Sequence, residues 1–283
     1  MSALGTVAEG SLGKTTLARL VAIEMGTRCH EASGPALTKG SDLVGTLTRM
    51  ETGDVLFVDE IHRLPIAVEE FIYSAMEDFR IDFTLDAGLH ARTVTYRLKP
   101  FTLVGATTRA GLLTGALRSR FGMAHHLRFY EPAELCEVLV RALPRMGVEA
   151  VPAALELIAA RSRGTPRITL RLLRRVRDFA HVHGTAGAPI DVGTTIAALA
   201  LEGIDDRGLD ALDRAYLRTL RDVYDGGPVG VEALAATLGE DSGTFEDVVE
   251  PYLLQTGLLA RTRQGRRMTD AAADHLDRSA STA

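Results

Sequence analysis

The chain has 283 residues, of which 46% are hydrophobic and 24% charged. This is the composition of a soluble globular protein with room for about two domains, or three small ones. No stretch of about 18 apolar residues and no signal-peptide layout occurs, so we expect neither a membrane span nor secretion, and a cytoplasmic location. Two cysteines, Cys29 and Cys136, are too few for a disulfide framework or a zinc site. The net charge of −5 excludes bulk attraction to a polyanion and leaves local arginine patches, at 161–177 and 261–267, as places where a nucleic acid could bind.

The first third of the chain alternates short apolar runs with helical patterns, which is typical of a parallel sheet with crossover helices. Residues 15–25 predict a helix, and the continuous apolar runs 54–58 and 101–104 predict strands that are buried on both faces. The alternating segment 79–98 predicts a hairpin. We therefore expect an α/β domain over residues 1–130.

The strand patterns then stop, and four amphipathic helical stretches predict a small all-helical domain over residues 131–204. Thr165-Pro166 is a good N-cap and first-turn pair, so the arginine-rich segment 167–181 is expected to form one helix. Residues 205–283 show three helical segments followed by a short hairpin centred on Gln264-Gly265. This pattern predicts a winged helix, which offers a helix to a DNA groove and a wing to phosphates.

A Gly-Lys-Thr-Thr run at residues 13–16 precedes the first predicted helix and indicates the second half of a phosphate-binding loop. In such a loop Lys14 reaches the outer phosphates and Thr15 offers its hydroxyl to Mg²⁺. The pair Asp59-Glu60 stands where a buried strand ends, so Asp59 can hold the metal through water and Glu60 can orient an attacking water. Simple solvation is the alternative for an Asp-Glu pair at a strand end. The loop and the acidic pair together predict a P-loop NTPase.

Longer motifs in all three predicted domains make the similarity to one family specific. They are SGPA at 33–36, FVDEIHRL at 57–64, AMEDF at 75–79, GATTR at 105–109, SRFG at 119–122, GTPRI at 164–168, RVRDFA at 175–180 and EPYL at 250–253. On these motifs the chain resembles the RuvB family, AAA+ motors that drive branch migration of Holliday junctions, from about residue 10 to about residue 270. The resemblance implies an AAA+ domain with a parallel sheet, a small helical lid and a C-terminal winged helix, acting in DNA recombination and repair.

The resemblance also assigns roles to three further residues, two of which the pattern alone would interpret differently. Thr108 matches a sensor of the outer phosphate, although by itself it would be a capped strand end. Arg120 matches a finger that a neighbouring subunit inserts toward the transferring phosphate, where a fixed guanidinium stabilises developing charge; by itself it would be a surface ion pair. Arg167 matches a second sensor, which couples nucleotide state to lid position.

ATP and Mg²⁺ are the cofactors that the resemblance implies. The catalytic residues it implies are Lys14, Asp59, Glu60, Thr108, Arg120 and Arg167. The residues expected to bind the nucleotide are Ser11, Gly13, Lys14, Thr15, Thr16, Glu77, Asp78, Phe79, Tyr130, Pro166 and Arg167. Thr15 and Asp59 are the expected metal ligands.

The expected partners follow from the same resemblance. Arg261 and Arg266 flank the wing turn and match the family's DNA-contacting arginines, whereas decorative surface charge is the alternative. The hairpin 79–98 is expected to dock a RuvA-type junction-binding protein through an apolar tip at Leu85 and Leu89. The subunits are expected to form a ring, usually of six. The other arginine cluster is interpreted as a solvated or interdomain face and consists of Arg171, Arg174, Arg175 and Arg177.

The beginning of the chain departs from the family pattern. Ala8 stands where the loop pattern has glycine, Ser11 adds a side chain near the phosphates, and Glu9 adds a negative charge. One such charge pair at ~8 Å costs roughly 2 kcal/mol at an effective dielectric of ~20. The segment that closes over the adenine in the family is absent, so we expect a truncated or rewritten N-terminus. A DNA motor and a non-hydrolysing DNA-binding or assembly scaffold both remain open; the retained catalytic set favours the motor and the altered loop favours the scaffold.

Overall fold

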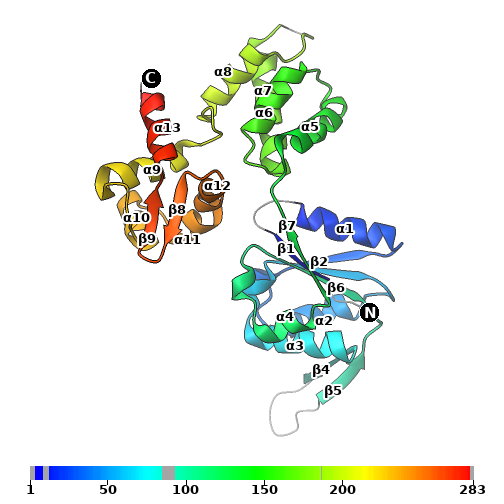
Figure 1. Ribbon diagram of the computed structural model, residues 1–283. Helices are drawn as coiled ribbons and strands as arrows, with labels where there is room; N and C mark the ends of the chain where they lie inside the picture. Colours follow the sequence, from blue (N-terminus) through cyan, green and yellow to red (C-terminus); the bar gives the residue numbers. More distant parts are fainter. Residues whose placement is uncertain (1–3, 9–12, 85–92, 186, 281–283) are drawn as a thin grey trace. The chain divides into compact units, whose positions relative to one another are not determined.

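Two compact units, Met1–Arg128 and Phe129–Ala283, make up the chain (Figure 1). The computed structural model describes residues 4–8, 13–84, 93–185 and 187–280. Within these residues no helix combines the length and the apolar character needed to cross a membrane.

A five-stranded parallel sheet forms the centre of the first unit. Its strands lie in the order β2 (Cys29–Ser33), β3 (Val55–Asp59), β6 (Thr102–Thr107), β1 (Leu4–Ala8) and β7 (Met123–Leu127). The two predicted apolar runs form β3 and β6, two of the three inner strands, and their burial on both faces is confirmed. Because all strands are parallel, the ends of β3 at Asp59 and of β6 at Thr107 lie on the same edge of the sheet as the end of β1 at Ala8.

Helices cover both faces of this sheet (Figure 1). The helix α1 (Lys14–Glu24) packs Ala18 and Ala22 on the face formed by alternate side chains of β3 and β6. Its larger apolar side chains Leu20 and Ile23 stay 48% and 68% exposed. The opposite face is covered by α2 (Ser41–Leu47), α3 (Ile66–Glu77) and α4 (Gly115–Arg120).

The predicted hairpin is present. Its strands β4 (Arg80–Thr84) and β5 (Thr93–Arg97) pair antiparallel. Ile81 and Leu98 anchor it in the core beside α3, being 0% and 7% exposed. The proposed docking residues Leu85 and Leu89 lie outside the described residues.

The second unit begins with the predicted helical domain. Its four helices are α5 (Pro132–Met146), α6 (Pro152–Ala160), α7 (Pro166–His183) and α8 (Val192–Leu201). They share one hydrophobic core. Thr165 is the N-cap residue of α7 and Pro166 its first residue, as expected, but the Thr165 side chain makes no capping hydrogen bond.

The remaining residues form the winged helix. Its helices are α9 (Ala211–Tyr224), α10 (Val231–Leu238), α11 (Ser242–Thr244) and α12 (Glu250–Gln255), followed by the wing strands β8 (Leu259–Thr262) and β9 (Gly265–Met268). A single π-helical turn, Phe245–Val249, joins α11 to α12. Thr262 pairs with Gly265, so the wing turn is Arg263-Gln264, one residue before the predicted centre. A further helix, α13 (Asp270–Ala280), was not predicted; its Ala272 and Leu276 are buried in the winged-helix core.

Candidate functional site

The start of α1 has the local geometry of the second half of a phosphate loop. Gly13 is the N-cap residue with φ 91°, a left-handed conformation that favours glycine. Lys14 is the first helical residue and is 9% exposed, Thr15 is half-buried and Thr16 is exposed. The first turn of α1 carries no acidic residue, and the backbone amides of a helix N-terminus attract anions. Residues 9–12, with Glu9 and Ser11, lie outside the described residues.

The predicted acidic pair ends β3 on the same sheet edge. Asp59 Oδ1 accepts a hydrogen bond of 3.0 Å from the Glu60 amide, and Glu60 has φ 49°, a strained value for a residue with a side chain. The Glu60 carboxylate accepts from Arg63 Nη1 at 3.2 Å. Gly34 lies so close that a Cβ there would meet the Glu60 carbonyl oxygen at 2.4 Å. The SGPA motif therefore supports the backbone that turns Glu60 out of the strand.

The end of β6 lies beside this pair and holds two consecutive threonines. Thr107 is 1% exposed, accepts from the Arg109 amide at 2.9 Å, and places its hydroxyl 2.8 Å from His62 Nδ1. Because the Arg109 amide occupies an acceptor position, the Thr107 hydroxyl can donate to His62. Thr108, the predicted sensor, follows at the strand end and is half-buried. Thr107 and His62, which join the two motifs, were not predicted as site residues; the sequence signal that could have identified them was their place within those motifs.

Arg120 is the last residue of α4, and its guanidinium contacts α3. It lies 4.1 Å from the centroid of the Tyr73 ring, and its Nε lies 2.9 Å from Glu77 Oε1. Asp78 forms an ion pair of 3.2 Å with Arg80. Phe79, with φ 48°, packs against the hydrophobic core and meets the Phe101 ring edge-on. Of the three residues predicted to contact nucleotide here, the structure thus brings Glu77 to Arg120 and gives Phe79 a packing contact.

Three other predicted residues gather at one end of the helical domain. The Tyr130 amide donates to the Gly164 carbonyl oxygen at 2.8 Å, and Pro166 starts α7. Arg167 is exposed in the first turn of α7. The neighbouring arginine cluster forms exposed or half-exposed ion pairs, Arg175 with Glu202 among them, which fits the solvated-face interpretation.

The two wing arginines make ion pairs within the winged helix. Glu250 is 0% exposed and accepts from Arg261 Nε at 2.8 Å, from Arg266 Nε at 3.0 Å and from the Tyr216 hydroxyl at 2.9 Å. Burial raises the pKa of Glu250, but these hydrogen bonds outweigh it and hold that pKa below its usual value. Arg266 also donates to Glu246 at 2.9 Å, and its side chain is 16% exposed, against 48% for Arg261. Arg261 is therefore better placed than Arg266 to meet a phosphate.

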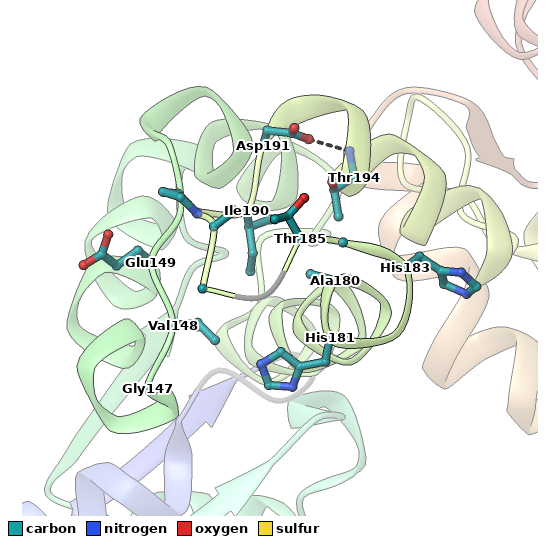
Figure 2. A pocket seen from close by; sticks show the side chains of 14 residues that line it. Gly147, Val148, Glu149, Ala180, His181, His183, Thr185, Ile190, Asp191 and Thr194 are labelled. Atoms are coloured by element: carbon teal, nitrogen blue, oxygen red, sulfur yellow. Dashed lines mark hydrogen bonds between the residues drawn. The ribbon is translucent and has the colours of Figure 1, made fainter.

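A pocket of about 650 Å³ opens on the helical domain, away from every predicted site residue of that domain. Figure 2 shows it between the end of α7, with His181 and His183, and the start of α8. Its Asp191 carboxylate caps α8 by accepting from the Thr194 amide at 2.7 Å. This carboxylate of the pocket lining thus has a structural role as a helix cap.

Family models match each domain of the chain. The model for the Holliday junction DNA helicase RuvB P-loop domain matches residues 6–127, that for the RuvB AAA lid domain residues 130–205, and that for the RuvB C-terminal winged helix domain residues 206–277.

Relatives and solved structures agree with these matches. A Holliday junction branch migration complex subunit RuvB from Desulfosudis oleivorans is 54% identical over 265 residues, which cover 94% of this chain and 77% of the relative. The corresponding subunit of Salinibacter ruber is 52% identical over 96% of this chain and 78% of its own length. The solved Thermotoga maritima RuvB Holliday junction branch migration motor is 48% identical and has a TM-score of 0.88, covering 98% of this chain and 87% of its own. Solved variants of that protein replace a lysine, an alanine, a threonine, an arginine and a proline, one at a time. The chain belongs to the RuvB family of Holliday junction branch migration motors.

Proposed function

We propose that this chain hydrolyses ATP with Mg²⁺ and moves duplex DNA at Holliday junctions. It would work as a ring of identical subunits, six in the family, beside a RuvA-type junction-binding protein in the cytoplasm. The observation that carries the proposal is the sheet edge where α1 starts and β3 and β6 end. There buried Lys14 begins the helix that follows β1, the acidic pair stands at the end of β3, and two threonines stand at the end of the adjacent strand β6.

A second observation supports the site residues. The intervals between the positions replaced in the Thermotoga variants equal the intervals between Lys14, Ala106, Thr108, Arg120 and Pro166, and the residue types agree. The relatives are described as branch migration subunits, and the non-hydrolysing scaffold gains no support from them.

Each side chain has a physical task in this proposal. Lys14 and the first-turn amides of α1 hold the phosphates, and Glu60 orients the attacking water. Thr15 and Asp59 offer the hydroxyl and carboxylate oxygens that Mg²⁺ prefers, and the bound ion would neutralise phosphate charge. Arg120 stabilises charge that develops on the nucleotide of the neighbouring subunit. The remaining proposed contacts are Gly13, Thr16, Ser11, Thr108, Glu77, Asp78, Phe79, Tyr130, Pro166 and Arg167.

Mixed rings test hydrolysis at the subunit boundary. Arg120→Ala and Glu60→Gln subunits should each be inactive alone, and their mixture should hydrolyse ATP, because an intact finger then meets an intact base at about one interface in four. The measurement is Mg²⁺-dependent hydrolysis, with duplex DNA present, across mixing ratios. Wild type that binds no ATP would overturn the motor in favour of the scaffold. Failure to recover in confirmed mixed rings would mean that Arg120 serves its own subunit.

The wing gives a test of DNA binding that does not depend on the phosphate loop. Arg261→Ala should weaken binding equally on duplexes of unrelated sequence and lower the slope of log K against log salt by about one unit, because the wing meets phosphates and not bases. Arg266→Ala should also lower the thermal unfolding temperature, since it removes two hydrogen bonds from buried Glu250 and one from Glu246. Affinities at several salt concentrations measure the effect on DNA binding and thermal denaturation measures the loss of stability, with exposed Arg145→Ala as the control for both. An unchanged slope for Arg261→Ala would leave that arginine with its internal ion pair alone.

A further inference from the structure

One stripe of α3 carries three polar side chains spaced four residues apart, Glu69, Tyr73 and Glu77. Residues at this spacing lie on the same face of a helix. That face meets the two ends of α4, through Thr114 at its N-cap and Arg120 at its last residue. The arginine assigned as the finger therefore folds back onto a prepared surface of its own subunit.

A hydrogen bond to Glu69 holds the hydroxyl group of Tyr73 in place. The hydroxyl donates to Glu69 Oε2 at 2.7 Å, and Thr114 Oγ1 donates to the same oxygen at 2.8 Å. Glu69 is 5% exposed, and the Thr114 hydroxyl also accepts from the Leu117 amide at 3.1 Å, which caps α4. Burial raises the pKa of Tyr73, so its hydroxyl keeps its proton. The ring cannot swing away about χ1 without breaking this part-buried hydrogen bond, whose acceptor Glu69 also accepts from the N-cap residue of α4.

The Arg120 guanidinium rests on the face of this ring, 4.1 Å from its centroid. Nη1 donates to the Ala116 carbonyl oxygen at 2.9 Å, and Nε lies 2.9 Å from Glu77 Oε1. The side chain is 26% exposed. A guanidinium over an aromatic face is attracted by the ring quadrupole, more strongly where water is excluded.

We propose that Tyr73, held by Glu69, is a positioning residue that fixes the orientation in which Arg120 is presented to the neighbouring subunit. A cation that is already oriented loses less entropy and reorganises less when charge develops in the transition state. The inference rests on the proposed function, because it concerns the finger in that reaction.

Two variants of Tyr73 separate the contribution of its ring from that of its hydroxyl group, and a variant of Tyr96 is the control. Tyr73→Leu removes the stacking surface and should lower kcat by about ten-fold, with the Kd for ATP unchanged because the subunit's own loop holds the nucleotide. Tyr73→Phe keeps the ring and should lose less. Tyr96→Leu, at an exposed tyrosine of β5, should leave kcat unchanged when no partner protein is present.

Mixed rings locate the defect. Adding Glu60→Gln subunits to Tyr73→Leu subunits should raise hydrolysis per Tyr73→Leu subunit, because the added subunits bring intact fingers. A Tyr73→Leu defect that no mixing ratio relieves would overturn the proposal and show a general structural role. Wild-type kcat in Tyr73→Leu, with Arg120→Ala inactive, would overturn it as well.

A measurement without ATP keeps the inference separate from the proposed function. In isotope-labelled protein, the side-chain protons of Arg120, assigned by their loss in Arg120→Ala, should show a ring-current shift that Tyr73→Leu abolishes and Tyr73→Phe retains. Shifts typical of a free arginine in the wild type would overturn the positioning role even if hydrolysis is normal. Absent hydrolysis with a normal ring-current shift would count against the proposed function alone.

Discussion

Replacing Glu60 with glutamine is expected to lower the turnover number for ATP by at least about 100-fold while ATP binding stays near the wild-type value. Glutamine has the shape of glutamate but cannot accept a proton from the attacking water. Glu60 is also held away from the strand by its left-handed backbone and by Arg63, so the variant should keep the local fold. Single-turnover hydrolysis and an ATP titration, both with Mg²⁺, measure the two effects.

Two comparison variants make this result specific. Glu70→Gln makes the same chemical change at an exposed position of α3 and should leave turnover unchanged. Lys14→Ala should instead weaken ATP binding, because it removes the cation at the phosphates. Equal hydrolysis by the wild type and Glu60→Gln would show that water is activated elsewhere.

The parts of the site that could be predicted from sequence are those that local pattern determines. The short, continuous, β-rich apolar runs that became β3 and β6 predict strands buried on both faces, which places the polar residues that follow them at a sheet edge. The order of strands could not be predicted, because the partner of each strand is chosen by the whole fold. That Gly34 packs on the Glu60 carbonyl oxygen also depends on the pairing of β2 with β3.

The contacts between individual side chains could not be predicted from the sequence for a related reason. Arg261 and Arg266 are neighbours across the wing strands, and both reach Glu250 at the start of α12, a contact that no spacing rule predicts. Hydrophobic periodicity also missed α13, since Asp270–Ala280 buries small or polar side chains such as Ala272 and His275 beside one leucine. His275 is 1% exposed and lies 2.9 Å from Asp205, a contact across 70 positions of sequence.

A buried ion pair at the junction of the helical domain and the winged helix was not predicted either. Arg163, with φ 51° and 8% exposed, donates from Nε to the Gly208 carbonyl oxygen at 3.0 Å. Its Nη2 hydrogen-bonds to Asp213, which is 0% exposed, and lies 2.8 Å from Asp210. Asp213 also accepts from the Asp210 amide at 2.9 Å in a capping box of α9. Arg163 stands four residues before Arg167, so it links the start of α7 to the start of the winged helix.

At pH 8, Arg163→Ala is expected to lower the free energy of unfolding by roughly 3–5 kcal/mol, because Asp213, which is ionised in the wild type at that pH, is left buried without its cation. Denaturant unfolding followed at the winged helix measures the loss, and exposed Arg145→Ala on α5 is the control. The double variant Arg163→Ala with Asp213→Asn should recover part of it, since the neutral amide costs less to bury than a carboxylate. A loss of stability no larger than that of Arg145→Ala would show that the pair contributes nothing net.

The same carboxyl should make stability depend on pH. Burial outweighs Arg163 and raises the pKa of Asp213 to about 7, whereas an unfolded chain has an aspartate pKa of about 3.9. Between these values the folded state holds a proton that the unfolded state has lost, so this contribution is fully present below pH ~4 and is lost as the pH rises to ~7. Asp213→Asn removes the titrating group and should lack this decline, so its stability relative to the wild type should rise from pH 4 to pH 7. Arg163→Ala, which takes away the cation that favours the carboxylate, should carry the decline to higher pH. Unfolding free energies at several pH values measure all three curves. An Asp213→Asn curve parallel to the wild-type curve from pH 4 to pH 7 would mean that Asp213 stays ionised in its pair with Arg163 throughout.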